Sequence, residues 1–144
     1  MALSFNNLGE IYAHEGNYNE AISHLEEALE IYKKANGLYK AKIALVLSNI
    51  GIIYEEMNNY GKAESYIKNA LKIYENNPSI IRTDYIYNLI ALARIKSHQN
   101  EEIKAEEIYQ KALKLARQIK FDNNVSLIMC LNSISVFYIA KKKP

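Results

Sequence analysis

The side chains best able to do chemistry are two histidines and one cysteine. His14 and His98 stand 84 residues apart, each near the end of an expected helix, and imidazole is a common metal ligand. Metal ligands must meet within bonds of about 2 Å, and a histidine at a helix C-terminus already complements the helix dipole. Cys130 lies in the apolar run of residues 128–131, which favours a buried core position over a redox role. We therefore predict no metal site.

A second candidate is a group of carboxylates at Glu101, Glu102, Glu106 and Glu107. They fall in the first turns of an expected helix, where acids complement the dipole and pair with bases such as Lys111. The sequence has no glycine-rich phosphate loop, no clustered Cys and His ligands and no Ser/His/Asp order. We therefore predict that the chain is not an enzyme and holds no cofactor.

The elements that must position any site are repeated helices. Residues 47–75 predict two amphipathic helices around a turn at Asn58 and Asn59, because apolar residues recur three or four positions apart. Residues 2–34 match residues 44–76 at 14 of 33 positions, a shift of 42 residues. A further shift of 42 aligns residues 89–114 more loosely, and another aligns residues 131–138 with residues 47–54. The sequence therefore predicts three helical pairs and one additional helix.

The repeated residues carry a recognisable motif. In each copy a bulky apolar residue precedes a small residue in the first helix, and the second helix reads Ala-x3-bulky-x2-Ala. This pattern resembles the tetratricopeptide repeat. Its period of 42 exceeds the usual 34, as in the arrays of kinesin light chains and bacterial peptide-pheromone receptors. The motif residues are Phe5, Leu8, Gly9, Tyr12, Ala21, Leu25 and Ala28 in the first copy, Leu47, Ile50, Gly51, Tyr54, Ala63, Ile67 and Ala70 in the second, and Leu89, Leu92, Ala93, Ala105, Tyr109 and Ala112 in the third, where Lys96 replaces the tyrosine.

The resemblance implies an all-α fold, a right-handed α-solenoid of about 3.5 helical hairpins with seven helices. We expect one domain over residues 1–144, with repeats at about 2–35, 39–77 and 79–120 and a lone final helix at 123–141. Within these repeats the periodicity and the turn residues predict helices at about 2–15, 18–35, 39–58, 60–76, 79–98, 101–119 and 123–141.

Composition fits a helical protein and excludes some partners. The chain is 49% apolar with a formal net charge of +2, and its 18 basic and 16 acidic residues are mixed along the sequence, so nothing predicts binding to nucleic acid or membrane. The lysines at 141–143 are interpreted as a solvated helix end. One cysteine excludes an intrachain disulfide, and no stretch approaches the length of about 20 apolar residues that a membrane span needs. We expect a cytoplasmic protein.

In the tetratricopeptide family the first helices of the repeats line a concave groove, and the resemblance carries that surface to this chain. Asn7 and Asn49 occupy the same repeat position, and a carboxamide can donate to and accept from a peptide backbone at once. The alternative is that these asparagines only tie neighbouring helices together. The expected peptide-binding residues are Asn6, Asn7, Glu10, Ser48, Asn49, Ile52, Ile90, Arg94 and Asn132, accompanied by Ala91, Ser133 and Val136.

The sequence thus predicts a non-enzymatic scaffold that binds a peptide or protein. Co-chaperone repeats that clamp a C-terminal carboxylate use Lys, Asn, Asn, Lys and Arg at fixed groove positions. The residues at those positions here are Asn6, Glu10, Asn49, Tyr87 and Ala91, and only Asn49 fits the clamp. Two alternatives stay open: a sensor segment of a peptide-responsive bacterial regulator, or a structural assembly module that self-associates.

Self-association would use the final helix. We expect Leu127, Leu131, Ile134 and Tyr138 to face inward, while Val136 and Ile139 face elsewhere and leave a second apolar side exposed. Because repeat arrays normally close with a polar outer face, a homodimer through this helix is a further prediction.

Overall fold

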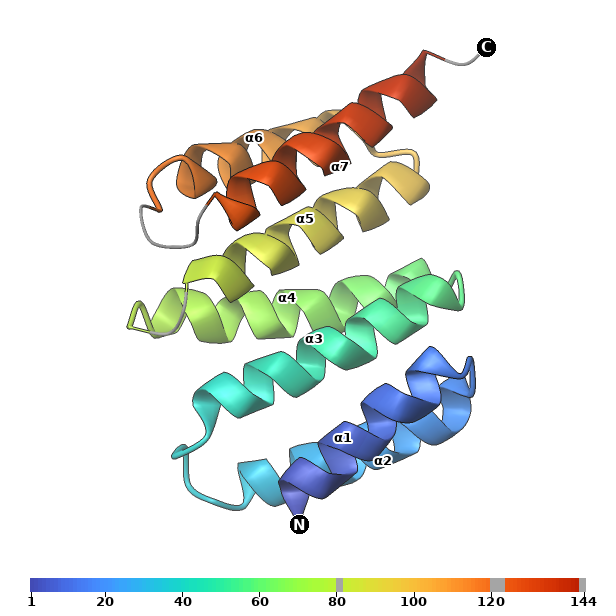
Figure 1. Cartoon of the computed structure of the whole chain (residues 1–144), viewed down its shortest axis with the longest axis vertical. Coiled ribbons are helices and arrows are strands. Elements are labelled where there is room, and N and C mark those ends of the chain that lie inside the picture. The colour runs from blue at the N-terminus through green and yellow to red at the C-terminus, as the bar shows by residue number, and fades with distance from the viewer. Residues whose placement is uncertain (80–81, 120–123, 143–144) are drawn as a thin grey trace. The chain divides into compact units, whose positions relative to one another are not determined.

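The computed structural model describes residues 1–79, 82–119 and 124–142. These residues form seven α-helices and no strand, which confirms the predicted all-α fold (Figure 1). Residues 80–81 of the expected fifth helix, residue 123 of the seventh and Lys143 of the basic run lie outside the described residues. The helices are α1 (Ala2–His14), α2 (Tyr18–Lys33), α3 (Lys40–Glu56), α4 (Tyr60–Asn76), α5 (Arg82–His98), α6 (Glu102–Ala116) and α7 (Val125–Lys141).

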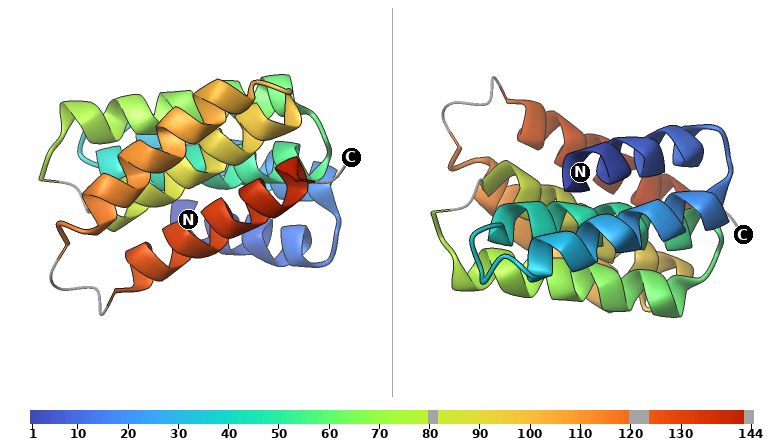
Figure 2. Two further views of the ribbon diagram at one scale, coloured as in Figure 1. Left: turned by 90° about the horizontal axis from the view of Figure 1, so that it is seen from above. Right: turned by 90° about the horizontal axis from the view of Figure 1, so that it is seen from below.

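The chain divides into two compact units, Met1–Ile80 and Ile81–Pro144. In the first unit α1 packs on α2 and α3 packs on α4, and α3 also contacts both α1 and α2 (Figure 1). In the second unit α5 packs on α6, and α7 contacts both of them (Figure 2). Each unit is therefore built from helical hairpins. The single domain expected over residues 1–144 stays a prediction.

The three hairpins share one turn geometry. The residue before each second helix's N-cap is in the left-handed region, with φ of +77° at Gly16, +58° at Asn58 and +60° at Asn100. Glycine and asparagine tolerate this conformation best, so the sequence places the turn. In each case the N-cap amide donates to the carbonyl five residues earlier, in the pairs Asn17 to Tyr12, Asn59 to Tyr54 and Glu101 to Lys96.

The motif glycines let the two helices of a hairpin approach closely. A Cβ atom on Gly9 would lie 2.6 Å from Cγ of Leu25, and one on Gly51 would lie 2.8 Å from Cδ1 of Ile67. Both of these large side chains are fully buried, as are Ala63 and Ala70 on the facing side of α4. The prediction that small residues bring these helices together is therefore consistent with the packing.

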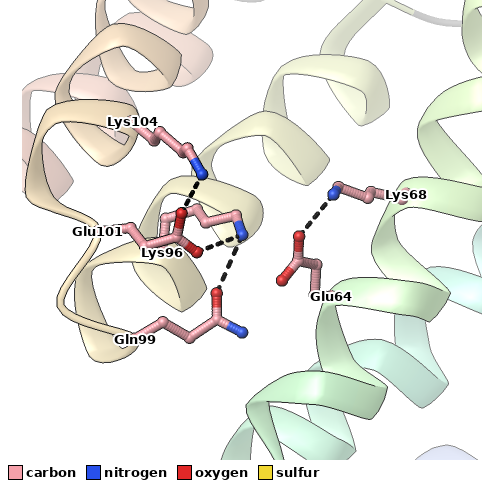
Figure 3. Close-up of polar contacts among 6 residues, drawn as sticks. All are labelled: Glu64, Lys68, Lys96, Gln99, Glu101 and Lys104. Carbon is pink, nitrogen blue, oxygen red and sulfur yellow. Dashed lines mark hydrogen bonds and ion pairs between the residues drawn. The ribbon is translucent and has the colours of Figure 1, made fainter.

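The third hairpin replaces the motif tyrosine with a buried ammonium group. Lys96 is 8% exposed, and its Nζ donates to Oε1 of Gln99 at 3.1 Å and to Oε1 of Glu101 at 2.7 Å (Figure 3). Lys104 pairs with the other oxygen of Glu101. By contrast, the Glu64–Lys68 pair drawn in Figure 3 is an i,i+4 pair along α4 whose lysine is mostly exposed. The glutamate cluster expected at 101–107 thus includes a structural partner for Lys96.

These contacts predict a pH dependence of stability. Hydrogen bonds from Lys104 and then Lys96 lower the pKa of Glu101 below its ordinary value of 4.5. This pKa is lower in the folded than in the unfolded chain. The ionised Glu101 therefore contributes fully to the stability of the folded chain above about pH 4.5, and this contribution is lost as the pH falls through the lowered pKa. We expect Glu101→Gln to narrow the difference in melting temperature between about pH 6 and pH 3, measured by circular dichroism. The control is Glu27→Gln, which should keep the wild-type difference in melting temperature between the two pH values. If Glu101→Gln kept the same difference as this control, the assignment of the pH dependence to Glu101 would be contradicted.

The inward face of α7 differs from the one predicted. Its buried residues are Ser126, Cys130 and Phe137, whereas Leu131 is 45% exposed, so the assignment of Leu131 to the inward face is wrong. Cys130 and Phe137 match buried residues of α3 in the repeat register, and the Phe137 ring lies 5.4 Å from that of Tyr109 on α6. This stripe contacts the preceding hairpin.

Leu131 belongs to another stripe of the repeat. Its counterpart Leu47 is 8% exposed on α3, which has α4 as its second helix, but no described helix follows α7. Leu127, Ile134 and Tyr138 are half-buried. Val136 and Ile139 are exposed, as expected for them.

Candidate functional site

A small pocket lies between α1 and α3 in the first unit. Its volume is about 170 Å³, well below the roughly 300–1,000 Å³ of pockets that enclose small-molecule ligands. Polar groups come from Glu10, His14 and Asn49, and the remaining walls are apolar. The full lining is Glu10, Ala13, His14, Leu25, Asn49, Ile52 and Ile53. A pocket of this size suits one side chain of a larger ligand.

A hydrogen-bonded carboxylate stands at the rim of this pocket. Oε1 of Glu10 accepts from Nδ2 of Asn6 at 2.8 Å and from Nδ2 of Asn49 at 3.1 Å. Asn6 is buried, and its Oδ1 has no partner in the part of the chain that the structure describes. The network ties α3 to α1 and fixes the orientation of the Asn49 amide.

The structure brings together four of the residues predicted for the site. Asn6, Glu10, Asn49 and Ile52 lie in or beside this pocket. Asn7 is exposed on α1, one turn from the pocket's polar groups. Ser48 is buried and its hydroxyl donates to the Ala44 carbonyl at 2.9 Å, so this hydroxyl is held within α3.

The remaining predicted residues belong to the second unit. On α5, Ile90 is buried and Arg94 is half-buried. On α7, Asn132 is exposed. The part that these three residues have in ligand binding stays a prediction.

Four residues of the pocket were absent from the predicted set: Ala13, His14, Leu25 and Ile53. His14 follows Glu10 by four residues, a spacing that places both on one face of a helix, and this signal was present in the sequence. Leu25 comes from α2, and only the packing of α2 against α1 brings it to the pocket. The part of the apolar wall that Leu25 contributes was therefore not accessible from the first helices alone.

Other reactive side chains have structural surroundings. Cys130 is fully buried, and burial raises the pKa of its thiol to about 11, so the thiol is protonated at neutral pH and is a poor nucleophile. The core position predicted for it is confirmed. Within residues 1–79, 82–119 and 124–142 no three His, Cys, Asp or Glu side chains gather where they could hold a metal ion.

None of the described helices combines the length and the apolar character needed to cross a membrane.

Comparison with known families agrees with the helical hairpins and their small-residue contacts. Models of the tetratricopeptide repeat match residues 1–76 and residues 86–119. The chain therefore belongs to the tetratricopeptide repeat family, whose members are in general non-enzymatic scaffolds for protein interaction. Among curated proteins, none matches the chain by sequence.

Solved structures show the same fold at low sequence identity. BtubC (BKLC) from P. vanneervenii has a TM-score of 0.80 and 20% identity, covering 96% of this chain and 55% of that one. The N-terminal domain of stress-induced protein-1 (STI-1) from C. elegans has a TM-score of 0.67 and 12% identity, with coverage of 92% and 94%. A Rap protein complexed with competence and sporulation factor has a TM-score of 0.66 and 22% identity, covering 94% of this chain and 40% of that one. The chain thus spans about half the length of BtubC.

Proposed function

We propose that the chain is a non-enzymatic docking module that binds a peptide or an extended protein segment on the face formed by α1 and α3. The supporting observation is the pocket between these helices, in which the Asn49 amide is held in one orientation by Glu10. Its Nδ2 is used by that bond, and its Oδ1 makes none of the contacts that the structure describes. This oxygen is available to accept a peptide N–H group.

Asn7 extends the same face by one turn of α1. Its side chain is exposed and makes no hydrogen bond among the described residues, so both its donor and its acceptor can serve a ligand backbone. A bond of this kind contributes about 1 kcal/mol net. Two of them orient an extended chain without choosing its sequence, so we assign selectivity to the pocket and not to the asparagines.

The test is a double substitution, Asn7→Ala with Asn49→Ala. Peptides are first selected from a random 12-residue display library on the wild-type chain, and their Kd values are measured by fluorescence anisotropy. We expect the double variant to bind about 30-fold more weakly, since two bonds of about 1 kcal/mol are lost. The matched control is Asn19→Ala with Asn69→Ala, two exposed asparagines on α2 and α4. Equal affinities for wild type and double variant would show that the asparagines are structural.

One alternative has an observation of its own. The likeness to a Rap protein complexed with competence and sporulation factor supports a sensor segment of a peptide-responsive bacterial regulator, with peptide binding as its input. The coding sequence that flanks residues 1–144 separates this from a free-standing scaffold, because a regulator would carry a DNA-binding or effector domain. A cytoplasmic location belongs to both proposals and is supported by the free, buried thiol of Cys130.

An assembly module is the third possibility that the sequence raised. The second unit exposes large apolar side chains along α7, and such a surface can bind a partner. A homodimer through this helix stays a prediction. The exposed residues are Val125, Ile128, Leu131, Val136 and Ile139.

A further inference from the structure

The pocket between α1 and α3 has a chemical preference of its own. We infer that it accepts a lysine or arginine side chain of the bound peptide, with Glu10 as the counter-ion. This inference rests on the peptide docking proposed above and adds to it the class of ligand: a basic segment and not an acidic one.

The first support is the way in which the Glu10 carboxylate is held. Its two described partners, Asn6 and Asn49, are neutral amides that share a single oxygen, Oε1. They position the group without cancelling its charge, and Oε2 accepts no hydrogen bond among the described contacts. An oriented anion with one unused oxygen is a strong acceptor for a charged donor.

The second support is the charge of the surrounding helices. Helix α1 contains no lysine or arginine, and α3 contains none after Lys42. Of the two carboxylates that end the α3 helix, Glu55 is buried and Glu56 is exposed. The lysines of this unit lie mostly on the second helices, at Lys33, Lys62, Lys68 and Lys72. The face formed by α1 and α3 thus attracts cations around the pocket.

The third support is the shape of the pocket. Leu25, Ile52 and Ile53 provide apolar walls, and the carboxylate and the Asn49 amide stand with His14 as the polar groups. Lysine and arginine match this arrangement, because an aliphatic stem packs on apolar surface while the charged head reaches a polar partner. The volume of about 170 Å³ leaves room for one such side chain and not for a cofactor.

The experiment is a double-mutant cycle between the pocket and a peptide. A random 12-residue phage-displayed library is selected on the wild-type chain at pH 8. We expect the enriched peptides to share a lysine or arginine at one position. The best of them is then synthesised with that residue and with methionine in its place, and both are titrated by fluorescence anisotropy.

Glu10→Gln is the matching change in the protein, since the glutamine oxygen can still accept from both asparagines. We expect the basic peptide to bind Glu10→Gln about three- to tenfold more weakly than wild type, and the methionine peptide to bind both proteins equally. The control Glu27→Gln removes the same charge from exposed α2 surface and should leave both affinities unchanged. Raising NaCl from about 50 to 500 mM should weaken only the basic peptide's binding, which tests the ion pair without any substitution in the protein.

The outcomes separate the inference from the proposed function. Selected peptides without a shared basic residue, or an equal loss from the methionine replacement on wild type and Glu10→Gln, overturn the cationic pocket and leave peptide docking intact. A wild-type chain that selects no peptide at all overturns both. Salt sensitivity that is the same for the two peptides also rejects Glu10 as the counter-ion.

Discussion

Alanine at position 9 should destabilise the first hairpin, although alanine favours a helix over glycine by about 1 kcal/mol. The added Cβ would lie 2.6 Å from Cγ and 2.9 Å from Cδ2 of Leu25, and 3.1 Å from the Ala21 carbonyl oxygen. Leu25 is fully buried and cannot move aside without disturbing its neighbours. Overpacking of this kind costs about 1–3 kcal/mol and outweighs the helix preference of alanine, so we expect Gly9→Ala to lower the free energy of unfolding by up to about 2 kcal/mol, measured by urea denaturation.

Gly61 supplies the control for that measurement. It lies in the first turn of α4, and a Cβ there would meet no atom within 4 Å. Gly61→Ala should therefore stabilise the chain, by up to about 1 kcal/mol. If Gly9→Ala were as stable as Gly61→Ala, the close approach of α1 and α2 would be contradicted.

Leucine at Ala63 or Ala70 should have an effect of similar size in the second hairpin. Both alanines are 0% exposed, and the Ala63 carbonyl oxygen lies 3.3 Å from the Cβ position of Gly51. Three added carbons have no space there, and overpacking should cost about 1–3 kcal/mol in each variant. Ala41→Leu on the exposed first turn of α3 is the matched control, expected to change stability by less than about 0.5 kcal/mol. A cost below about 0.5 kcal/mol at both buried sites would show that the helix faces are assigned wrongly.

The helices could be predicted from the sequence because local signals mark them. Apolar residues three or four positions apart define each stripe, and Asn58 and Asn100 mark turns that need a left-handed residue. The ends agree with the structure to within three residues where the structure describes them. The inward face of α7 could not be read in the same way, because two stripes of this helix are apolar and only the contact of Phe137 with Tyr109 decides between them.

The candidate site was predictable in its parts but not in its connections. The repeat register placed Glu10 and Asn49 on the first helices, yet it contained no sign that the two side chains bond to each other. That contact depends on how α3 packs beside α1, which is a property of three-dimensional packing and not of spacing along one helix. The apolar wall from Leu25 depends on tertiary packing for the same reason.

The pairing of the buried Lys96 with the half-buried Glu101 constrains how such a hairpin can evolve. The second hairpin holds Tyr54 and Asn59 at the same two positions. Starting from that pair, a glutamate at the N-cap is acceptable as a first substitution, because an acid suits a helix N-terminus. A lysine introduced first would bury an ammonium group without a carboxylate to receive it, which is strongly destabilising. The accessible mutational route between the two hairpin types therefore has a direction, with the acid gained before the base and the base lost before the acid.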